Sequence, residues 1–292
     1  MYNKGSVITI GNFDGVHLGH QAILKKLVDV SKKENLKSIV ITFDLSINKT
    51  DFLLTTEQEK IELLSDFTLD EILILKVNKK LISTSADKFF EEILIKQLNV
   101  KHIVVGYDAA FGKNREGNIS WLKKTAKEKN IKLDIVKPVK VNNKIVSSSK
   151  IKKLLSNNKI ELANKMLGKF FEINGTHISG NKIGRKIGFP TININVAGNK
   201  KIPRGVFGCF LVGKTKKYLG ALNIGLRPTL KLKEHKLSIE VHLLNFNGIW
   251  KEKNIKLLIF KFIRKEKKFT SVKVLVNNLK KDIKRLKLFM FK

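Results

Sequence analysis

The stretch that decides the fold reads Ser6-Val7-Ile8-Thr9-Ile10-Gly11-Asn12-Phe13-Asp14-Gly15-Val16-His17-Leu18-Gly19-His20. It begins with a β-branched apolar run, typical of a buried strand, and continues into a turn that contains glycine. The residues that follow, Leu18–Lys33, carry apolar side chains such as Leu24, Leu27 and Val28 at helical spacing. We therefore expect a strand, a tight turn and a helix whose N-terminus faces the turn.

The first half of the chain repeats this alternation of strand and helix. We expect further strands at Ser38–Phe43, Ile72–Lys76, His102–Val105 and Lys132–Val136, and helices at Glu57–Ser65, Ala86–Leu98 and Ser120–Lys129. This βαβα order predicts an α/β domain, a Rossmann-like doubly wound parallel sheet with helices on both faces. Ligands of such sheets bind beyond the carboxyl ends of the strands, so the first turn is the first candidate site.

The pattern changes near Leu167-Gly168, where glycines and prolines become frequent. Short strands are expected at Phe170–His177, Thr191–Val196, Val206–Val212, Tyr218–Asn223, Leu237–Leu244 and Ile255–Phe262. A final helix over Ser271–Phe289, with Thr270 or Ser271 as N-cap, carries an apolar stripe of Leu275, Leu279, Ile283 and Leu286. We therefore predict a small antiparallel β-barrel with a C-terminal helix. A helical segment at Ser148–Leu167 precedes it, and the domains are 1–166 and 167–292.

The composition is that of a lysine-rich globular protein, with 42% hydrophobic and 28% charged residues in 292. The net charge of +33 leaves a nucleic-acid-binding protein open as an alternative. However, only six of the 58 basic residues are arginines, and the lysines are spread along the whole chain, so we expect no dedicated nucleic-acid partner. Cys209 is the single cysteine, and the apolar runs are too short for a membrane span. We expect a cytoplasmic protein with no membrane partner.

The first candidate site is the turn at Gly11–His20. Its glycines let the backbone approach a ligand, and the helix N-terminus offers unpaired N–H groups to an anion. His17 and His20 are three residues apart, so both rings can point to the same side at a helix start. Together these groups could stabilise charge on a nucleotide phosphate. A metal-binding pair or a surface pair of histidines is the alternative.

His17-Leu18-Gly19-His20 resembles the His-x-Gly-His signature of the nucleotidyltransferase superfamily, and Val7–His20 resembles the start of bacterial bifunctional riboflavin kinase/FAD synthetases. The resemblance continues through Val104–Asp108, Phe111–Gly117 and Val146–Lys152. It implies that FMN is adenylylated with ATP, that His17 and His20 are catalytic, and that Asp108 binds flavin. The implied ATP-binding residues are Gly11, Phe13, Asp14, Gly15, His17, His20, Ser147, Ser148 and Lys152. For the two serines, a plain helix N-cap is the alternative.

Three departures from this family pattern concern the adenylylation site. Lys152 stands where the family usually has an arginine, which replaces a bidentate phosphate fork by a point charge. Ala109 and Ala110 stand where an aromatic residue and an arginine are usual, and Leu45-Ser46-Ile47 replaces a loop with proline and histidine. A riboflavin kinase with an impaired adenylyltransferase domain is therefore an alternative function.

The second candidate site is the glycine-rich stretch Gly180–Asn193. Side chains two apart on a strand face the same way, so Thr191 and Asn193 could jointly hold a Mg²⁺–phosphate group. The glycines could offer backbone N–H groups to a nucleotide. Taken alone, the glycines fit a hairpin loop equally well.

Pro190-Thr191-Ile192-Asn193 resembles the flavokinase motif, as do Asn223–Thr229, Glu240–Phe246 and Ile263–Phe269. This resemblance implies that Glu240 is the general base for the riboflavin 5′-hydroxyl, and that Thr191 and Asn193 hold the metal. The implied ATP-binding residues are Gly180, Gly184, Arg185, Thr191 and Asn193, and the implied flavin-binding residues are Asn223, Gly225, Arg227, Arg264 and Phe269. Without the motif, Glu240 would be interpreted as a surface residue. His242 shares its face and is interpreted as a packed or solvated histidine.

The two resemblances together imply a bifunctional enzyme of flavin-cofactor synthesis. One site would phosphorylate riboflavin to FMN, and the other would adenylylate FMN to FAD. The expected partners are riboflavin, FMN and ATP as a co-substrate, with Mg²⁺ as the cofactor.

Overall fold

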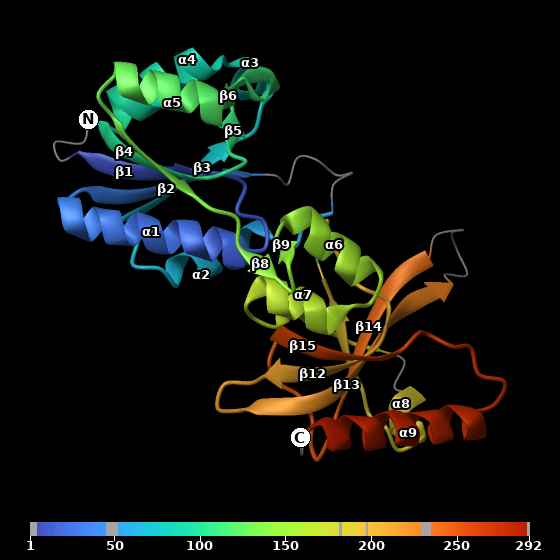
Figure 1. Cartoon of the computed structure of the whole chain (residues 1–292). Coiled ribbons are helices and arrows are strands. Elements are labelled where there is room, and N and C mark those ends of the chain that lie inside the picture. Colours follow the sequence, from blue (N-terminus) through green and yellow to red (C-terminus); the bar gives the residue numbers. More distant parts are fainter. Residues whose placement is uncertain (1–4, 45–51, 181–182, 197, 229–234, 291–292) are drawn as a thin grey trace. The chain divides into compact units, whose positions relative to one another are not determined.

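The computed structural model describes residues 5–44, 52–180, 183–196, 198–228 and 235–290 (Figure 1). The chain divides into two compact units, Met1–Ser148 and Ser149–Lys292. Each unit has its own buried apolar core, around Ile39 and Val104 in the first and around Phe207 and Leu257 in the second.

The first unit is built on a five-stranded parallel sheet in the order β3-β2-β1-β4-β7. The strands are β1 (Ser6–Ile10), β2 (Lys37–Asp44), β3 (Glu71–Lys76), β4 (Val100–Gly106) and β7 (Lys132–Val136). The order in which strands are added reverses at β1. The chain first adds β2 and β3 on one side of β1, and then adds β4 and β7 on the other side. This topology confirms the Rossmann-like domain. Sheets of this kind usually bind ligands at the carboxyl ends of the strands where the order reverses, which here are β1 and β4.

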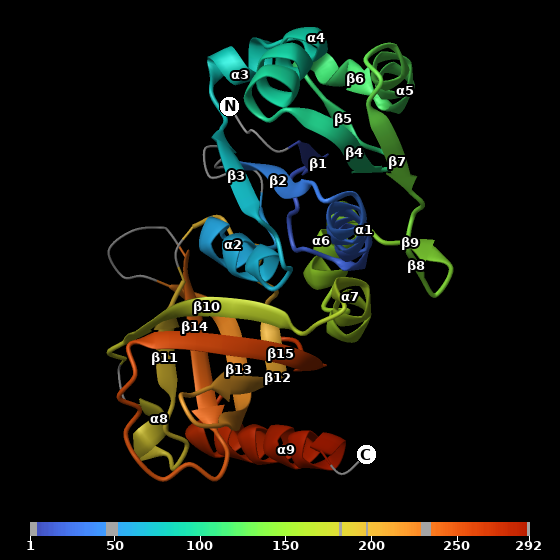
Figure 2. The same ribbon diagram turned by 90° about the vertical axis from the view of Figure 1, so that its left-hand side faces the viewer.

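Helices cover both faces of this sheet (Figures 1 and 2). Successive side chains of β1 point to opposite faces, so each face contributes to a separate apolar cluster. Val7 packs with α1 (Leu18–Glu34) and α2 (Glu57–Ser65), whereas Ile8 packs with the helices of the opposite face. Those helices are α3 (Lys79–Ser83), α4 (Ala86–Phe89), the π-helix η1 (Phe90–Gln97) and α5 (Ile119–Glu128). The helix predicted over Ala86–Leu98 is therefore one short α-turn followed by a wider π-helix.

Several short elements of the first unit were not predicted. Two small hairpins pair β5 (Ala110–Phe111) with β6 (Gly117–Asn118), and β8 (Lys140–Val141) with β9 (Lys144–Ile145). A 3₁₀ turn, η2, spans Lys113–Arg115. The predicted helical segment Ser148–Leu167, which belongs to the second unit from Ser149 on, is two helices, α6 (Ser148–Ser156) and α7 (Ile160–Leu167), separated at Asn158, whose φ is 55°.

The second unit is a closed antiparallel barrel, as predicted, in the order β10-β11-β14-β13-β12-β15. The strands are β10 (Phe171–Ile178), β11 (Ile192–Asn195), β12 (Gly205–Val212), β13 (Lys217–Pro228), β14 (His235–Leu243) and β15 (Asn254–Arg264). The pairing of β10 with β15 closes it. A one-turn helix, α8 (Ile183–Lys186), interrupts the glycine-rich stretch between β10 and β11.

The C-terminal helix α9 (Val272–Met290) packs on the barrel (Figure 2). Ser271 begins it, since its hydroxyl accepts a hydrogen bond from the Val274 amide at 3.3 Å. The predicted stripe faces the barrel, and Leu286 is fully buried where it approaches Gly208. No helix within the described residues is long and apolar enough to cross a membrane.

Candidate active sites

The turn after β1 is held in an unusual backbone shape. Phe13 and Val16 adopt φ of 49° and 39°, in the left-handed region that non-glycine residues seldom occupy, and Gly15 between them has φ 86°. Hydrogen bonds to one neighbouring residue fix this shape. The Asp14 carboxylate accepts from the Thr55 amide at 3.2 Å, and the Gly15 amide donates to the Thr55 hydroxyl at 3.1 Å. Backbone strain at such a turn is typical of a ligand-binding loop.

His17 and His20 lie together at the start of α1. Their rings stack with centroids 3.6 Å apart and an angle of 16° between planes, and His17 is 5% exposed. The Nδ1 of His17 accepts a hydrogen bond from the backbone amide of His20 at 3.3 Å and so caps the helix. Nδ1 is therefore the acceptor nitrogen, which leaves Nε2–H as the donor of a neutral His17 ring.

The second predicted ATP-binding motif meets this turn through Ser148. Its hydroxyl donates to the carbonyl oxygen of Asp14 at 2.9 Å, and α6 begins at this serine, directly after Ser147. Gly11 donates its amide to the carbonyl oxygen of Ile41 at 3.0 Å, which ties the end of β1 to β2. Lys152 lies one turn further along α6, within the second compact unit.

Asp108 lies in an exposed turn after β4, at the same sheet edge as the histidine turn, because β4 pairs with β1. Its backbone carbonyl accepts a hydrogen bond from Arg115 Nη2 at 3.4 Å. Ala109 packs against the apolar core beside α5. The replaced loop at Leu45-Ser46-Ile47 lies outside the described residues.

In the barrel, the predicted kinase residues converge on one place. Glu240 on β14 lies opposite Asn193 on β11 and opposite Asn223 on β13, so three neighbouring strands present these side chains in one row. The Thr191 hydroxyl donates to Glu240 Oε2 at 3.2 Å, and the Ser238 hydroxyl donates to Oε1 at 3.1 Å. The carboxylate is thus held by hydrogen bonds, with Thr191 at one side of it.

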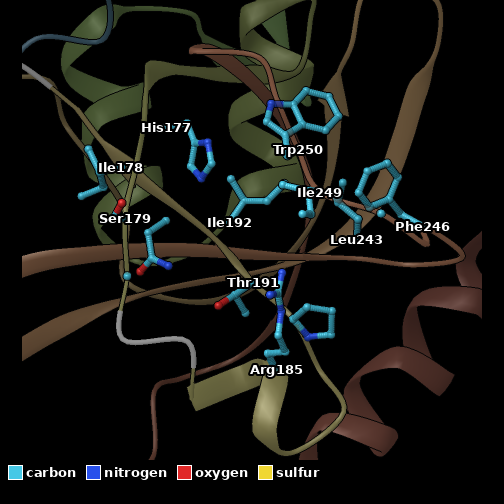
Figure 3. A pocket seen from close by; sticks show the side chains of 14 residues that line it. His177, Ile178, Ser179, Arg185, Thr191, Ile192, Leu243, Phe246, Ile249 and Trp250 are labelled. Carbon is cyan, nitrogen blue, oxygen red and sulfur yellow. The ribbon is translucent and has the colours of Figure 1, made fainter.

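A cavity of about 210 Å³ opens on one side of Thr191 (Figure 3). Thr191 and Arg185 lie at one end, and the bulky side chains of Trp250, Phe246 and Ile249 lie at the other. Gly180 also lines this cavity and lies against the side-chain amide of Asn193, so a Cβ at Gly180 would collide with that amide. This division suits a ligand with an anionic part and a flat, less polar part.

Thr191 also lines a second cavity, of about 310 Å³. Glu240 and Asn223 supply polar groups to its wall. Its apolar wall comes from two aromatic residues and from the inner stripe of α9, namely Phe189, Phe269, Leu275, Leu279 and Ile283. Thr191 borders both cavities, so it lies where their contents would meet.

Comparison with known proteins places the chain in a family. Residues 1–150 match the family model of FAD synthetase, and residues 167–290 match that of riboflavin kinase. The chain belongs to the bifunctional riboflavin kinase/FMN adenylyltransferases. A protein of that name from Buchnera aphidicola of Schizaphis graminum is 42% identical over 98% of this chain and 94% of its own length. The Escherichia coli K12 protein of that name is 32% identical, over 96% of this chain and 91% of its own.

A solved structure supports the fold of this family member over nearly its whole length. A crystal structure from Streptococcus pneumoniae, described as a macrolide-efflux protein, superposes with a TM-score of 0.88 at 26% identity. It covers 98% of this chain and 95% of its own. The likeness concerns the arrangement of helices and strands.

Among the predicted flavin residues of this family member, Arg264 has a protein partner. Its guanidinium donates to both oxygens of the buried Asp282 on α9, at 2.8 to 3.1 Å, and lies 5.5 Å from the ring centre of Phe269. Gly225 lies against the Glu266 carboxylate. The side chain of Arg227 lies outside the described residues, so its flavin contact stays a prediction.

The sequence left open whether His242 is packed or solvated, and the structure shows that it is packed. Its Nδ1 lies 2.8 Å from the carbonyl oxygen of Pro190, and its ring meets Phe189 edge-on. The aromatic residues Phe189, Phe246 and Trp250 line the cavities but were not singled out in the sequence. The position of Phe189 directly after Gly188 was the one feature of the sequence that could have indicated an aromatic cavity wall.

Proposed function

We propose that this chain makes FMN from riboflavin and ATP in its barrel unit, and FAD from FMN and a second ATP in its parallel-sheet unit. The observation that carries the kinase half is the position of Thr191, which borders both cavities and donates to Glu240 at 3.2 Å. Two substrates bound in these cavities would bring their reacting groups together at this residue, which is what direct transfer of a phosphoryl group requires.

Riboflavin would occupy the cavity under α9, with its ring system against the apolar stripe and its 5′-hydroxyl at Glu240. The carboxylate accepts the hydroxyl proton while the oxygen attacks the γ-phosphorus of ATP, and ADP leaves. ATP would lie in the other cavity, with its phosphates along Gly180 and Arg185 and its nucleoside near Trp250. Gly184, the remaining proposed ATP-binding residue, lines the flavin cavity beside Thr191. Asn223, Gly225, Arg227, Arg264 and Phe269 are proposed as the flavin-binding residues.

Mg²⁺ fits the donor set between the two cavities. The Thr191 hydroxyl and the Asn193 amide oxygen are hard oxygen donors, and Asn193 lies opposite Glu240 in the strand register. One or two such protein oxygens, completed by substrate phosphates, are the usual way in which proteins hold this ion. When bound, Mg²⁺ would offset the negative charge of the phosphoryl group in transfer.

In the parallel-sheet unit, we propose that His17 and His20 stabilise charge on the α-phosphate of ATP. An FMN phosphate oxygen attacks the α-phosphorus, the bond to pyrophosphate breaks, and no enzyme-bound intermediate is needed. Nε2–H of His17 and the N-terminus of α1 are donors for this charge. Gly11, Phe13, Asp14 and Gly15 shape the cradle, Ser147, Ser148 and Lys152 bind the triphosphate, and Asp108 binds the flavin.

We also propose functional boundaries and a location. The adenylyltransferase domain would span 1–166 and the kinase domain 167–292, a boundary drawn from the sequence motifs, whereas the compact units divide after Ser148 and α7 packs against β15 of the barrel. The expected location is the cytoplasm, because the substrate is ATP and the one cysteine, Cys209, is a buried free thiol.

One assay tests the two-site assignment. The full chain is incubated with riboflavin, ATP and Mg²⁺, or with FMN, ATP and Mg²⁺, and the flavins are separated by chromatography. Glu240→Gln should abolish FMN formation and leave conversion of supplied FMN to FAD intact, whereas His17→Ala should do the reverse. Equal loss of both steps in either variant would contradict two separate sites, and FMN as the only product of the unmodified chain would indicate an impaired adenylyltransferase.

A further inference from the structure

Lys60 is a buried lysine at the edge of the adenylyltransferase site. It lies at the end of the first turn of α2, is 5% exposed, and with Lys200 is one of two lysines that the described part of the chain buries. An ammonium group seldom leaves water unless its charge is compensated. Almost all other described lysines reach the surface, so the burial of Lys60 requires groups nearby that compensate its charge.

The Lys60 ammonium is joined to the histidine turn by a short chain of hydrogen bonds. Its Nζ donates to the carbonyl oxygen of Phe43 at 2.6 Å and to the hydroxyl of Thr42 at 3.1 Å, both at the carboxyl end of β2. The Thr42 hydroxyl then donates to the carbonyl oxygen of Asn12, next to Gly11, at 3.2 Å. A hydroxyl that accepts from a cation is a stronger donor, so the contact to the turn gains from the charge.

The segment that carries Lys60 also forms hydrogen bonds with the other end of the histidine turn, at Asp14 and Gly15. Thr55 binds Asp14 and Gly15, and the next residue, Thr56, begins α2 with a capping box that includes Glu59. The helix start is thereby fixed, and Lys60 projects from the end of its first turn. Segment 55–60 therefore holds the turn at Asn12 through Lys60 and at Asp14 through Thr55.

The electrostatic setting of Lys60 suits a group that supports anion binding. Burial lowers the pKa of Lys60, and the carboxylates of Glu57, Asp14 and Asp44 act in the opposite direction. The positive charge lies at the sheet edge where a polyanionic substrate is expected, and in a poorly hydrated place such a charge acts strongly.

We propose that Lys60 is a positioning residue for adenylyl transfer: through Thr42 it holds the histidine turn in its binding shape. This inference rests on the proposed function of the parallel-sheet unit. Because the pKa of Lys60 is lowered, the ammonium loses its proton at a lower pH than an ordinary lysine, whose pKa is about 10.4. The rate of FAD formation should therefore fall as the pH rises through that lowered value.

The test measures kcat and KM for FAD formation from FMN and MgATP between about pH 6 and 10, with riboflavin phosphorylation by the same chain as a fold control. Lys60→Met should lower kcat at least about tenfold and abolish the alkaline fall. Lys60→Arg should restore much of the rate and move the fall to higher pH, because a guanidinium stays charged. Lys25→Met, an exposed lysine on α1, is the matched control and should behave as the unmodified chain.

The outcomes separate this proposal from the function on which it rests. If the unmodified chain makes no FAD, the proposed function fails. If it makes FAD and Lys60→Met does so at an equal rate with an unchanged pH profile, the role of Lys60 is refuted. If Lys60→Met fails to fold, the pH profiles decide: the absence of an alkaline fall in the unmodified chain, or an identical fall in Lys60→Arg, would refute it.

Discussion

The ion pair between Arg264 and Asp282 gives the sharpest test of how the C-terminal helix is held on the barrel. Three hydrogen bonds join the two groups, and the side chains are only 12% and 2% exposed. Asp282→Asn keeps one oxygen acceptor, replaces the other with an amino group, and leaves the guanidinium without a counter-charge. Breaking a buried pair from one side costs about 3–5 kcal/mol. Because one acceptor remains, we expect the lower end, about 3 kcal/mol.

Urea unfolding measures this loss in the barrel unit. The chain has two tryptophans, so a Trp121→Phe background leaves Trp250, 7% exposed in the barrel, as the reporter. With a slope of about 2 kcal/mol per molar urea, Asp282→Asn should lower the midpoint by about 1.5 M. The Michaelis constant for riboflavin should rise as well, because α9 lines the cavity that contains Glu240.

Arg285→Gln, an exposed position on the same helix, is the matched control and should change stability by no more than about 0.5 kcal/mol. Unfolding of Asp282→Asn at the same urea concentration as the background, or an equal shift of the midpoint in the control, would refute a stabilising role of this ion pair.

Two further predictions follow from contacts elsewhere in the chain. Gly180→Ala should push the Asn193 amide aside and slow FMN formation about tenfold, while supplied FMN is still converted to FAD; an unchanged kinase rate would exclude this contact. Glu34 accepts from Lys132 at 2.9 Å, which lowers the pKa of its carboxyl below the ordinary 4.5. The stability this adds is complete above about pH 4.5 and is lost as the pH falls through the lowered value. Glu34→Gln should therefore cost about 0.5–1 kcal/mol near neutral pH and nothing near pH 2 in denaturation curves, and a cost independent of pH would contradict the assignment.

The sequence predicted the longer helices and strands well because burial leaves a recognisable pattern of apolar residues in them. The strand Ser6–Ile10 is buried on both faces and therefore appears as a continuous β-branched run. The helix α9 is buried on one face and therefore carries its apolar residues as a stripe. The two-residue hairpin strands leave no such period. Nothing singled out in the sequence marked the change to a π-helix at Phe90.

The sequence likewise indicated some residues of the candidate sites and left others unrecognised. The row of Asn193, Glu240 and Asn223 follows from strand register, which the motifs indicate indirectly. Trp250 has the sequence character of a core residue, and only the folded barrel reveals that it lines a cavity. The partner of Arg264 is 18 residues away on a helix, and Lys60 is one of 58 basic residues, so neither could be singled out before their neighbours were known.

The shared wall at Thr191 has a consequence for inhibitor design. Because one threonine borders both cavities, a single synthetic compound could join a nucleoside-like group to a flavin-like group by a short linker across it. Tethering two weak binders in this way can raise overall affinity by about 10²–10⁴-fold when the linker matches the span. Such a bisubstrate ligand would distinguish this enzyme from proteins that recognise only ATP or only a flavin.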